Sequence, residues 1–235
     1  ERERRDTLRQ RRLSLGEVLA RAEAHYRAQL KATPRAVEYL KRRGLTGAIA
    51  ARFAREGYIA CLTRRSADKL QPAVDAIRAA GGQAFGYGSD ARKEEEVAAL
   101  VERVEREHGA IEVLVFNIGA NVPCSILEET PRKYFKIWEM ACFGGFLNAR
   151  EVALRMVGRG RGTILFTGAT ASLRGSAHFA AFAGAKHALR ALAQSMAREL
   201  GPKNIHVAHV VVDGAIDTEF IRSSFPERYA LKEQG

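Results

Sequence analysis

Short apolar segments alternate with longer amphipathic segments along the chain from residue 58 onward. The apolar segments lie at 58–63 (YIACLT), 83–87 (QAFGY), 111–117 (IEVLVFN), 163–167 (TILFT) and 205–212 (IHVAHVVV). Helical periodicity fills the intervals, at about 67–80, 92–109, 131–158 and 178–200. Strands that alternate with helices in this way predict an α/β fold, in which right-handed βαβ units build a parallel sheet covered by helices on both faces.

The first 57 residues have a different pattern, which predicts helix almost throughout. A capping box opens a helix over 14–31, and a proline at the first helical position opens a second helix over 33–43. Gly44 stands where the second helix should end, and a third helix is expected from about 46 to 57.

Charge divides the chain at nearly the same place. Residues 1–47 contain thirteen Lys and Arg against six Asp and Glu, a net charge of +7 out of +11 for the whole chain. We therefore divide the chain into a basic helical appendage, residues 1–46, and an α/β domain, residues 47–235. A basic segment makes nucleic acid a candidate partner. A solvated helical surface is the simpler interpretation of the same charges.

Composition narrows the class of protein further. Apolar residues make up 46% of the chain, which suffices for a core, and no apolar run approaches the roughly 18 residues that span a bilayer. The three cysteines, Cys61, Cys124 and Cys142, are far apart and form no CxxC pair. We expect neither a disulfide framework nor a metal site, no membrane partner, and a soluble cytoplasmic protein.

Residues 47–220 resemble the short-chain dehydrogenase/reductase family. The matching stretches include GAIAARFAREGY (47–58), IEVLVFNIG (111–119), GRGTILFTGATASLRG (160–175), KHALRALAQSMARELGP (186–202) and DGAIDTEF (213–220). The resemblance implies a Rossmann-like, doubly wound parallel sheet and an NAD(P)-dependent oxidoreductase acting on a small molecule. It also implies a homo-oligomer, whose interface would be the apolar stripes of the helices at 131–158 and 178–200.

Residues 12–58 resemble a different protein, the stretch of bacterial DNA primase between its zinc-binding and polymerase domains. The supporting text is LGEVLARAEAHYRAQL, TPRAVEYLKRRGL, and IAARF followed by Gly57 and Tyr58. The two resemblances overlap at residues 49–54, which indicates a fusion point and a chimeric chain. The segment holds none of the primase's zinc ligands or acidic metal-binding residues, so polymerisation is not implied.

The glycine-rich turn that cradles a dinucleotide's pyrophosphate is only partly present. The family writes it TGxxxGxG after an apolar strand, and here only Gly44 matches, while Leu40 and Thr46 replace the other two glycines. The stretch TPRAVE (33–38) before it contains a proline and two charges, so it is a poor central strand. We expect the family's first strand, and also its last, to be missing. Alternatively, 33–46 extends, the sheet closes differently, or another chain supplies the strand.

Other cofactor positions survive in the resemblance. They are Thr63, Arg64 and Arg65 after the second strand, Asp90 after the third, Asn117 and Gly119 in the family's NNAG segment, Lys186, and Ile216 and Thr218 in DGAIDTEF. Basic residues at 64 and 65 suit a ribose 2′-phosphate, so the implied cofactor is NADP. The arginines could instead be solvated loop charges, and Asp90 a plain helix N-cap.

The catalytic positions of the family are mostly replaced. Its YxxxK motif reads Phe182 to Lys186, its serine falls on Ala169 and its asparagine on Ala141, so only Lys186 remains. Phenylalanine cannot donate the proton that a developing alkoxide needs, and positioned acid catalysis is worth roughly 10²–10⁴-fold. Lys186 itself is a relic, a ribose contact or a structural cation.

Three functions remain open at this stage. The leading one is a dehydrogenase-like pseudoenzyme of weak or no activity. The first alternative is an atypical NADP-dependent reductase that uses substitute residues, for which the candidates are His178, Thr170, Ser172 and Ser176. The second is a nucleic-acid-binding module, in which the basic helices of residues 1–46 contact phosphates.

Overall fold

The computed structural model describes residues 46–212, which lie within one compact unit. The predicted helices over 14–31 and 33–43, Gly44, and the pair Ile216 and Thr218 lie outside the described residues. The third predicted helix is present over residues 46–55, so the segment shared by the two resemblances is helical. It ends just before Gly57, whose φ of +89° suits glycine.

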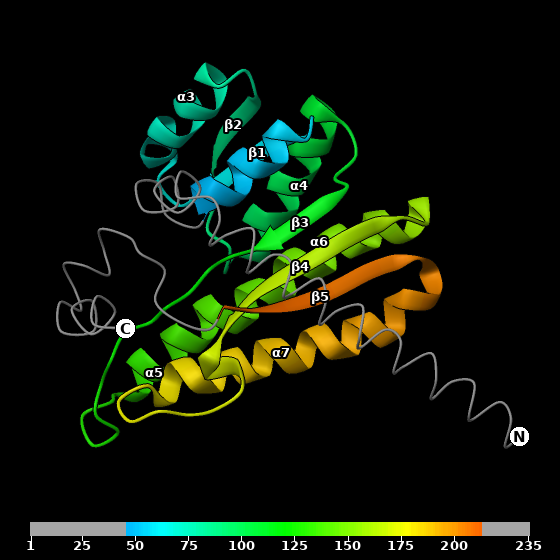
Figure 1. Cartoon of the computed structure of the whole chain (residues 1–235). Coiled ribbons are helices and arrows are strands. Elements are labelled where there is room, and N and C mark those ends of the chain that lie inside the picture. Colours follow the sequence, from blue (N-terminus) through cyan, green and yellow to red (C-terminus); the bar gives the residue numbers. More distant parts are fainter. Residues whose placement is uncertain (1–45, 213–235) are drawn as a thin grey trace, which may run out of the picture. The chain divides into compact units, whose positions relative to one another are not determined.

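All five predicted strands are present within this part of the chain (Figure 1). They are β1 (Ile59–Arg64), β2 (Gln83–Gly88), β3 (Val113–Phe116), β4 (Gly162–Ala169) and β5 (Ile205–Val212). The predicted helices between them are confirmed as well. They are η1 (Ala67–Leu70) with α3 (Gln71–Ala79), α4 (Glu94–His108), α5 (Pro131–Trp138) with the π-turn η2 (Glu139–Phe143) and α6 (Gly144–Arg159), and α7 (Ala180–Leu200). Two short 3-10 turns, η3 (Thr170–Ser172) and η4 (Gly201–Lys203), flank α7.

The strands form two parallel sheets, not one continuous sheet. β1 pairs with β2, and β3, β4 and β5 pair in that order. Among residues 46–212, therefore, β1 and β3 each have a hydrogen-bonded neighbour on one side only. This is the arrangement expected where no described strand lies between β1 and β3.

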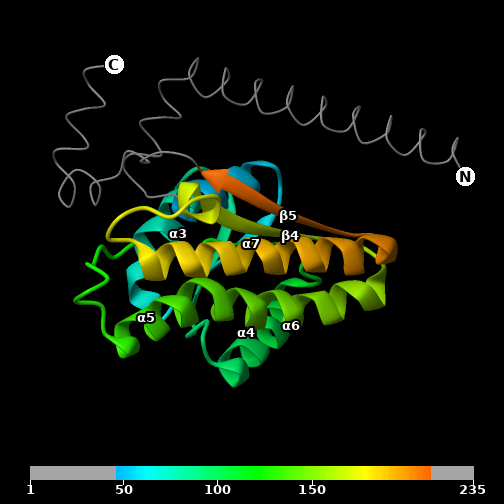
Figure 2. The same cartoon turned by 90° about the horizontal axis from the view of Figure 1, so that it is seen from below.

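The main core lies between the three-stranded sheet and two long helices. α6 and α7 cover one face of that sheet, and α4 packs against α6 (Figure 2). Phe166 and Ile164 of β4 are fully buried against Met156 of α6 and Leu189 of α7. Burying such side chains contributes about 1.5–3 kcal/mol each, so this interface stabilises the described part of the chain. No helix within residues 46–212 has the length and apolar character needed to cross a bilayer.

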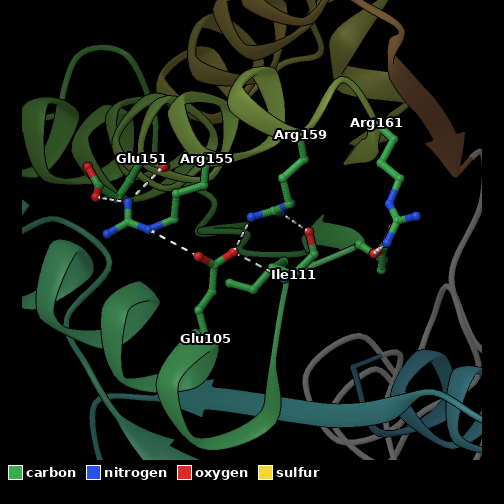
Figure 3. Close-up of polar contacts among 7 residues, drawn as sticks. Glu105, Ile111, Glu151, Arg155, Arg159 and Arg161 are labelled. Carbon is green, nitrogen blue, oxygen red and sulfur yellow. Dashed lines mark hydrogen bonds and ion pairs between the residues drawn. The ribbon is translucent and has the colours of Figure 1, made fainter.

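An ion-pair cluster joins α4, α6 and the approach to β3 (Figure 3). The carboxylate of Glu105 accepts hydrogen bonds from Arg159 Nη1 at 2.8 Å and from the backbone N–H of Ile111 at 3.1 Å, and Arg155 Nε lies 3.4 Å away. Arg159 also donates to the carbonyl of Ile111, at 2.9 Å. This cluster anchors the chain at Ile111, two residues before β3 begins.

Candidate functional site

The candidate site lies where the strands end. In open α/β sheets, ligands bind at the carboxyl ends of the parallel strands. Arg64 ends β1, Asn117 follows β3, and Ala169 ends β4. The backbone N–H of Ser89, just after β2, donates to the carbonyl of Arg64 at 3.0 Å, so the ends of β1 and β2 are fixed to each other.

Lys186 lies on α7 and is almost completely buried, with 3% of its surface exposed. Its Nζ donates to the backbone carbonyl of Thr167 at 2.8 Å and to that of Ile118 at 3.1 Å. The amine thus connects β4 to the segment after β3. Burial lowers the pKa of Lys186 to about 8, because the charged form loses its hydration.

Phe182 lies one turn before Lys186, and the amine is 5.9 Å from the centroid of its ring. The ring is buried with Ala120, Ile137 and Ala181, and Ala169 packs against the same cluster. The structure therefore brings three of the family's four catalytic positions together, residues 169, 182 and 186. The side chains at the first two are apolar, so Lys186 has no hydroxyl partner from them.

The fourth position, Ala141, is fully buried in η2. It packs with Cys142 and with Ala185, the residue before Lys186. Alanine has no polar atom with which to bind a water or a backbone group there. This position contributes packing to the site and no polar contact.

The substitute residues are arranged less favourably than a direct replacement requires. Ser172 is fully buried, and its hydroxyl accepts the backbone N–H of Ala169 at 3.1 Å. Thr170 is partly buried, whereas Ser176 is exposed. His178 is exposed at a φ of +66°, and its carbonyl accepts a hydrogen bond from the N–H of Cys124.

Asp90 is held by a neighbour that the sequence reasoning did not identify. Arg92 Nε and Nη2 donate to the two carboxylate oxygens of Asp90 at 2.8 and 2.5 Å, and Arg92 Nη1 pairs with Glu139 at 3.2 Å. The Arg92 side chain, which donates to the charged form, lowers the pKa of Asp90 to about 2. Lys93, not Asp90, is the N-cap of α4, so the helix-cap interpretation is wrong. In the sequence, the Asp-x-Arg spacing of Asp90 and Arg92 could have indicated this pairing.

The remaining cofactor positions are dispersed around the strand ends. Asn117 Nδ2 donates to Thr46 Oγ1 at 2.8 Å, which ties the end of β3 to the start of the first described helix. Gly119 is exposed, with nothing within 4 Å of the place a Cβ would take. The side chains of Thr63, Arg64 and Arg65 are exposed.

His209 of β5 is a second residue that the sequence reasoning missed. Its Nε2 is buried without a hydrogen-bond partner, and its ring occupies the place where residue 168 would carry a Cβ. Burial lowers its pKa, and the positive charges of Lys186 and Arg190 lower it further. In the sequence, only the position of His209 within the predicted strand 205–212 could have indicated that its side chain points into the domain. No cluster of three or more metal-ligating side chains occurs in residues 46–212.

Comparison with known proteins settles the family. The family model described as short chain dehydrogenase matches residues 41–228. The chain belongs to the short-chain dehydrogenase family. A short-chain dehydrogenase structure from Rhodopseudomonas palustris is 48% identical, with a TM-score of 0.70, over 80% of this chain and 89% of that one.

Two further relatives are oxidoreductases by name. The 7alpha-hydroxysteroid dehydrogenase of Escherichia coli is 32% identical over 77% of this chain and 70% of its own length. A metagenomic short-chain oxidoreductase, solved in complex with NADP, is 28% identical with a TM-score of 0.68, over 72% of this chain and 77% of that chain. The α/β, Rossmann-like class expected from the sequence is thereby supported.

The described residues fit the phosphate-bearing end of a nicotinamide nucleotide better than its reactive end. Arg64 and Arg65 are exposed at the strand end, where an added phosphate could be neutralised. At the other end, Phe182 and Ala169 offer no donor to an oxygen beside the nicotinamide, and Lys186 donates to two carbonyls.

Proposed function

We propose that this short-chain dehydrogenase relative binds NADP and reduces carbonyl substrates weakly or not at all. The observation that carries the proposal is that the apolar side chains of Phe182 and Ala169 stand at the positions of the family's proton donor and its serine, while the Lys186 amine donates to two backbone carbonyls. A bound nicotinamide supplies hydride. The chain must supply a proton donor, and none of the three replaced positions, Phe182, Ala169 and Ala141, has a side-chain hydroxyl.

Lys186 does not compensate for this loss. Its Nζ is directed to the carbonyls of Thr167 and Ile118, so its established contacts are internal. Loss of a positioned acid lowers the rate by roughly 10²–10⁴-fold, and loss of the hydroxyl that binds the carbonyl oxygen adds to it. We therefore infer a structural role for the amine, which holds β4 and the segment after β3 together.

Binding of the cofactor is assigned to the strand ends. Arg64 and Arg65 take the ribose 2′-phosphate, and Thr63 lies beside them. Asp90 and Arg92 form a fixed pair next to the adenine position, because their two-point hydrogen bonding restrains both side chains. Further contacts are assigned to Gly44, Asn117, Gly119, Ile216 and Thr218.

A row of aromatic side chains, exposed at Phe135 and Phe146 and half-buried at Trp138 and Phe143, supports assembly with a second copy of the chain. Phe135 and Trp138 stack with ring centroids 6.0 Å apart, and the series continues through Phe143 to Phe146. Phe135 and Leu154 are each 59% exposed. Covering such a row of apolar side chains is favourable, so we assign α5 and α6 to a homo-oligomer interface.

The decisive experiment compares binding with turnover. NADPH and NADH are titrated by fluorescence, and NADPH oxidation is followed with a panel of ketones for the wild type and for Phe182→Tyr/Ala169→Ser. We expect NADPH to bind more tightly than NADH, little turnover by the wild type, and a gain of at least about tenfold in the double variant. Phe135→Tyr, at an exposed ring, is the matched control and should show no gain.

The outcomes separate the alternatives. Wild-type turnover at the level of the double variant would favour the atypical reductase, and loss of that turnover in His178→Ala would identify its acid. Failure of both nucleotides to bind would refute the cofactor assignment. Titration with short DNA at low and high salt tests the nucleic-acid alternative, since phosphate-driven binding weakens steeply as salt rises.

A further inference from the structure

A cavity of about 460 Å³ lies between the two sheets. Its lining includes the consecutive residues 57–63, with most of β1, and the consecutive residues 108–118, with all of β3. Side chains alternate between the faces of a strand, so a cavity lined by consecutive residues of both strands, all of β3 and all of β1 except Arg64, adjoins their hydrogen-bonding edges. The cavity is therefore a slot between two strand edges.

Side chains from three helices also line the slot. Ile49 and Phe53 of the helix over residues 46–55 line it, as do Val101 and Val104 of α4 and Val152 of α6. These side chains are apolar. An occupant of the slot would thus have apolar neighbours, as a central strand of a parallel sheet has.

Both edges of the slot lack a backbone partner within the described residues. β1 is paired with β2 alone and β3 with β4 alone. The apolar side chains of Val113, Leu114 and Val115 are only partly buried, and Ile59 is 37% exposed. Unpaired backbone groups in an apolar setting are costly, so these two edges favour any segment that can hydrogen-bond to both.

We propose that the slot binds an extended, uncharged, apolar peptide segment of another polypeptide, which adds as a strand between β1 and β3. β1 has six residues and β3 has four, so the bound segment needs about the same length. Backbone hydrogen bonds to two edges provide affinity, and the apolar lining selects apolar side chains. The inference does not depend on nucleotide binding.

Charge complementarity favours a segment in trans over the residues that precede Thr46. The stretch KATPRAVEYLKRRGL (31–45) contains six charged residues and Pro34. Among the lining residues, Glu112 is the only Asp, Glu, Lys or Arg. Burying unpaired charges in an apolar slot is strongly unfavourable, and proline cannot donate to a neighbouring strand.

The probe is a synthetic peptide with the sequence of residues 162–168 (GTILFTG), extended by two lysines for solubility. In this chain that sequence forms most of β4, a strand paired on both sides. The control peptide is GTPLPTG with the same lysines, because each proline removes a backbone donor. Binding to the full chain is measured by calorimetry, and hydrogen exchange reports the amides of β1 and β3.

We expect saturable binding of the first peptide only, with at least about tenfold slower exchange at both Ile59–Arg64 and Val113–Phe116. Ala50→Phe places a ring in the slot and should weaken binding at least about tenfold. Ala99→Phe, on the exposed side of α4, is the matched control and should bind like the wild type.

Three results would overturn the proposal. The first is no binding, or protection at only one of the two edges. The second is full protection of both edges in the free chain at every concentration, which would mean that residues of the same chain fill the slot. The third is protection that grows with protein concentration in the absence of peptide, which would assign the slot to a second copy.

Discussion

Lys186 Nζ and the carbonyl oxygen of Thr167 are 2.8 Å apart, in a part of the domain from which water is almost excluded. The amine donates a second hydrogen bond to the carbonyl of Ile118. The buried amine therefore bridges β4 and the segment after β3. Its burial makes the bridge sensitive to pH.

Lys186→Met should change how stability depends on pH. The pKa of Lys186 is about 8 in the folded chain against 10.5 when exposed, so between these values the unfolded state binds more protons. The free energy of unfolding of the wild type therefore rises with pH across this window, by on the order of 3 kcal/mol relative to Lys186→Met. Urea unfolding at pH 7.5, 9 and 10 measures the difference. Lys203→Met, at an exposed lysine, is the control; parallel curves for wild type and Lys186→Met would contradict the burial argument.

Gly168→Ala should destabilise the domain through His209. A Cβ on residue 168 would lie 2.1 Å from Cε1 of the His209 ring, so the ring must move. Overpacking of this kind costs roughly 1–3 kcal/mol. Thermal unfolding should show a clear loss for Gly168→Ala and little for Gly175→Ala, where no atom is within 4 Å of the new Cβ. In a His209→Ala background the loss should largely disappear, and its persistence would place the strain elsewhere.

The alternation of short apolar runs with helical stretches was sufficient to predict the described fold. Both strands are runs of mainly apolar and β-branched residues, so β4 was predicted to within two residues of its ends and β5 over its full length. The break between β1 and β3 is observed within residues 46–212. The expectation that TPRAVE (33–38) forms no strand between them stays a prediction, because those residues lie outside the described part of the chain. Patterning alone, however, gave no indication that the break leaves a cavity lined by both edges.

Side-chain partners were the least predictable part of the site. Asp90 was expected near a nucleotide or at a helix cap, but its contact with Arg92 depends on how the turn before α4 folds. His209 is separated from Gly168 by 41 positions, and their contact follows only from the pairing of β4 with β5. Local spacing predicts elements, whereas such contacts depend on the register of the sheet.

Charging the aromatic row should reduce the size of the assembly. Phe135 and Leu154 are each 59% exposed on α5 and α6, so Phe135→Glu/Leu154→Glu removes little packing beyond the stack of Phe135 on Trp138. Light scattering should show an oligomer for the wild type and a smaller species for the double variant, because burying carboxylates in an apolar interface is costly. Leu127→Glu, at a side chain 93% exposed in a loop, is the control. A wild-type monomer at every concentration would contradict the assignment.

Glu105→Ala should destabilise the domain more than loss of an ordinary surface carboxylate. Glu105 accepts from Arg159 and from the N–H of Ile111 and pairs with Arg155, so its removal leaves a backbone donor and two partly buried guanidinium groups without that partner (Figure 3). We expect a loss on the order of 2 kcal/mol in urea unfolding. Glu102→Ala, in an exposed pair with Arg106 at 3.8 Å on the same helix, should cost well under about 1 kcal/mol. Hydrogen exchange of the β3 amides reports the start of that strand, so it should accelerate in Glu105→Ala alone. Equal losses of stability in the two variants would show that the cluster stabilises the domain no more than ordinary surface charges do.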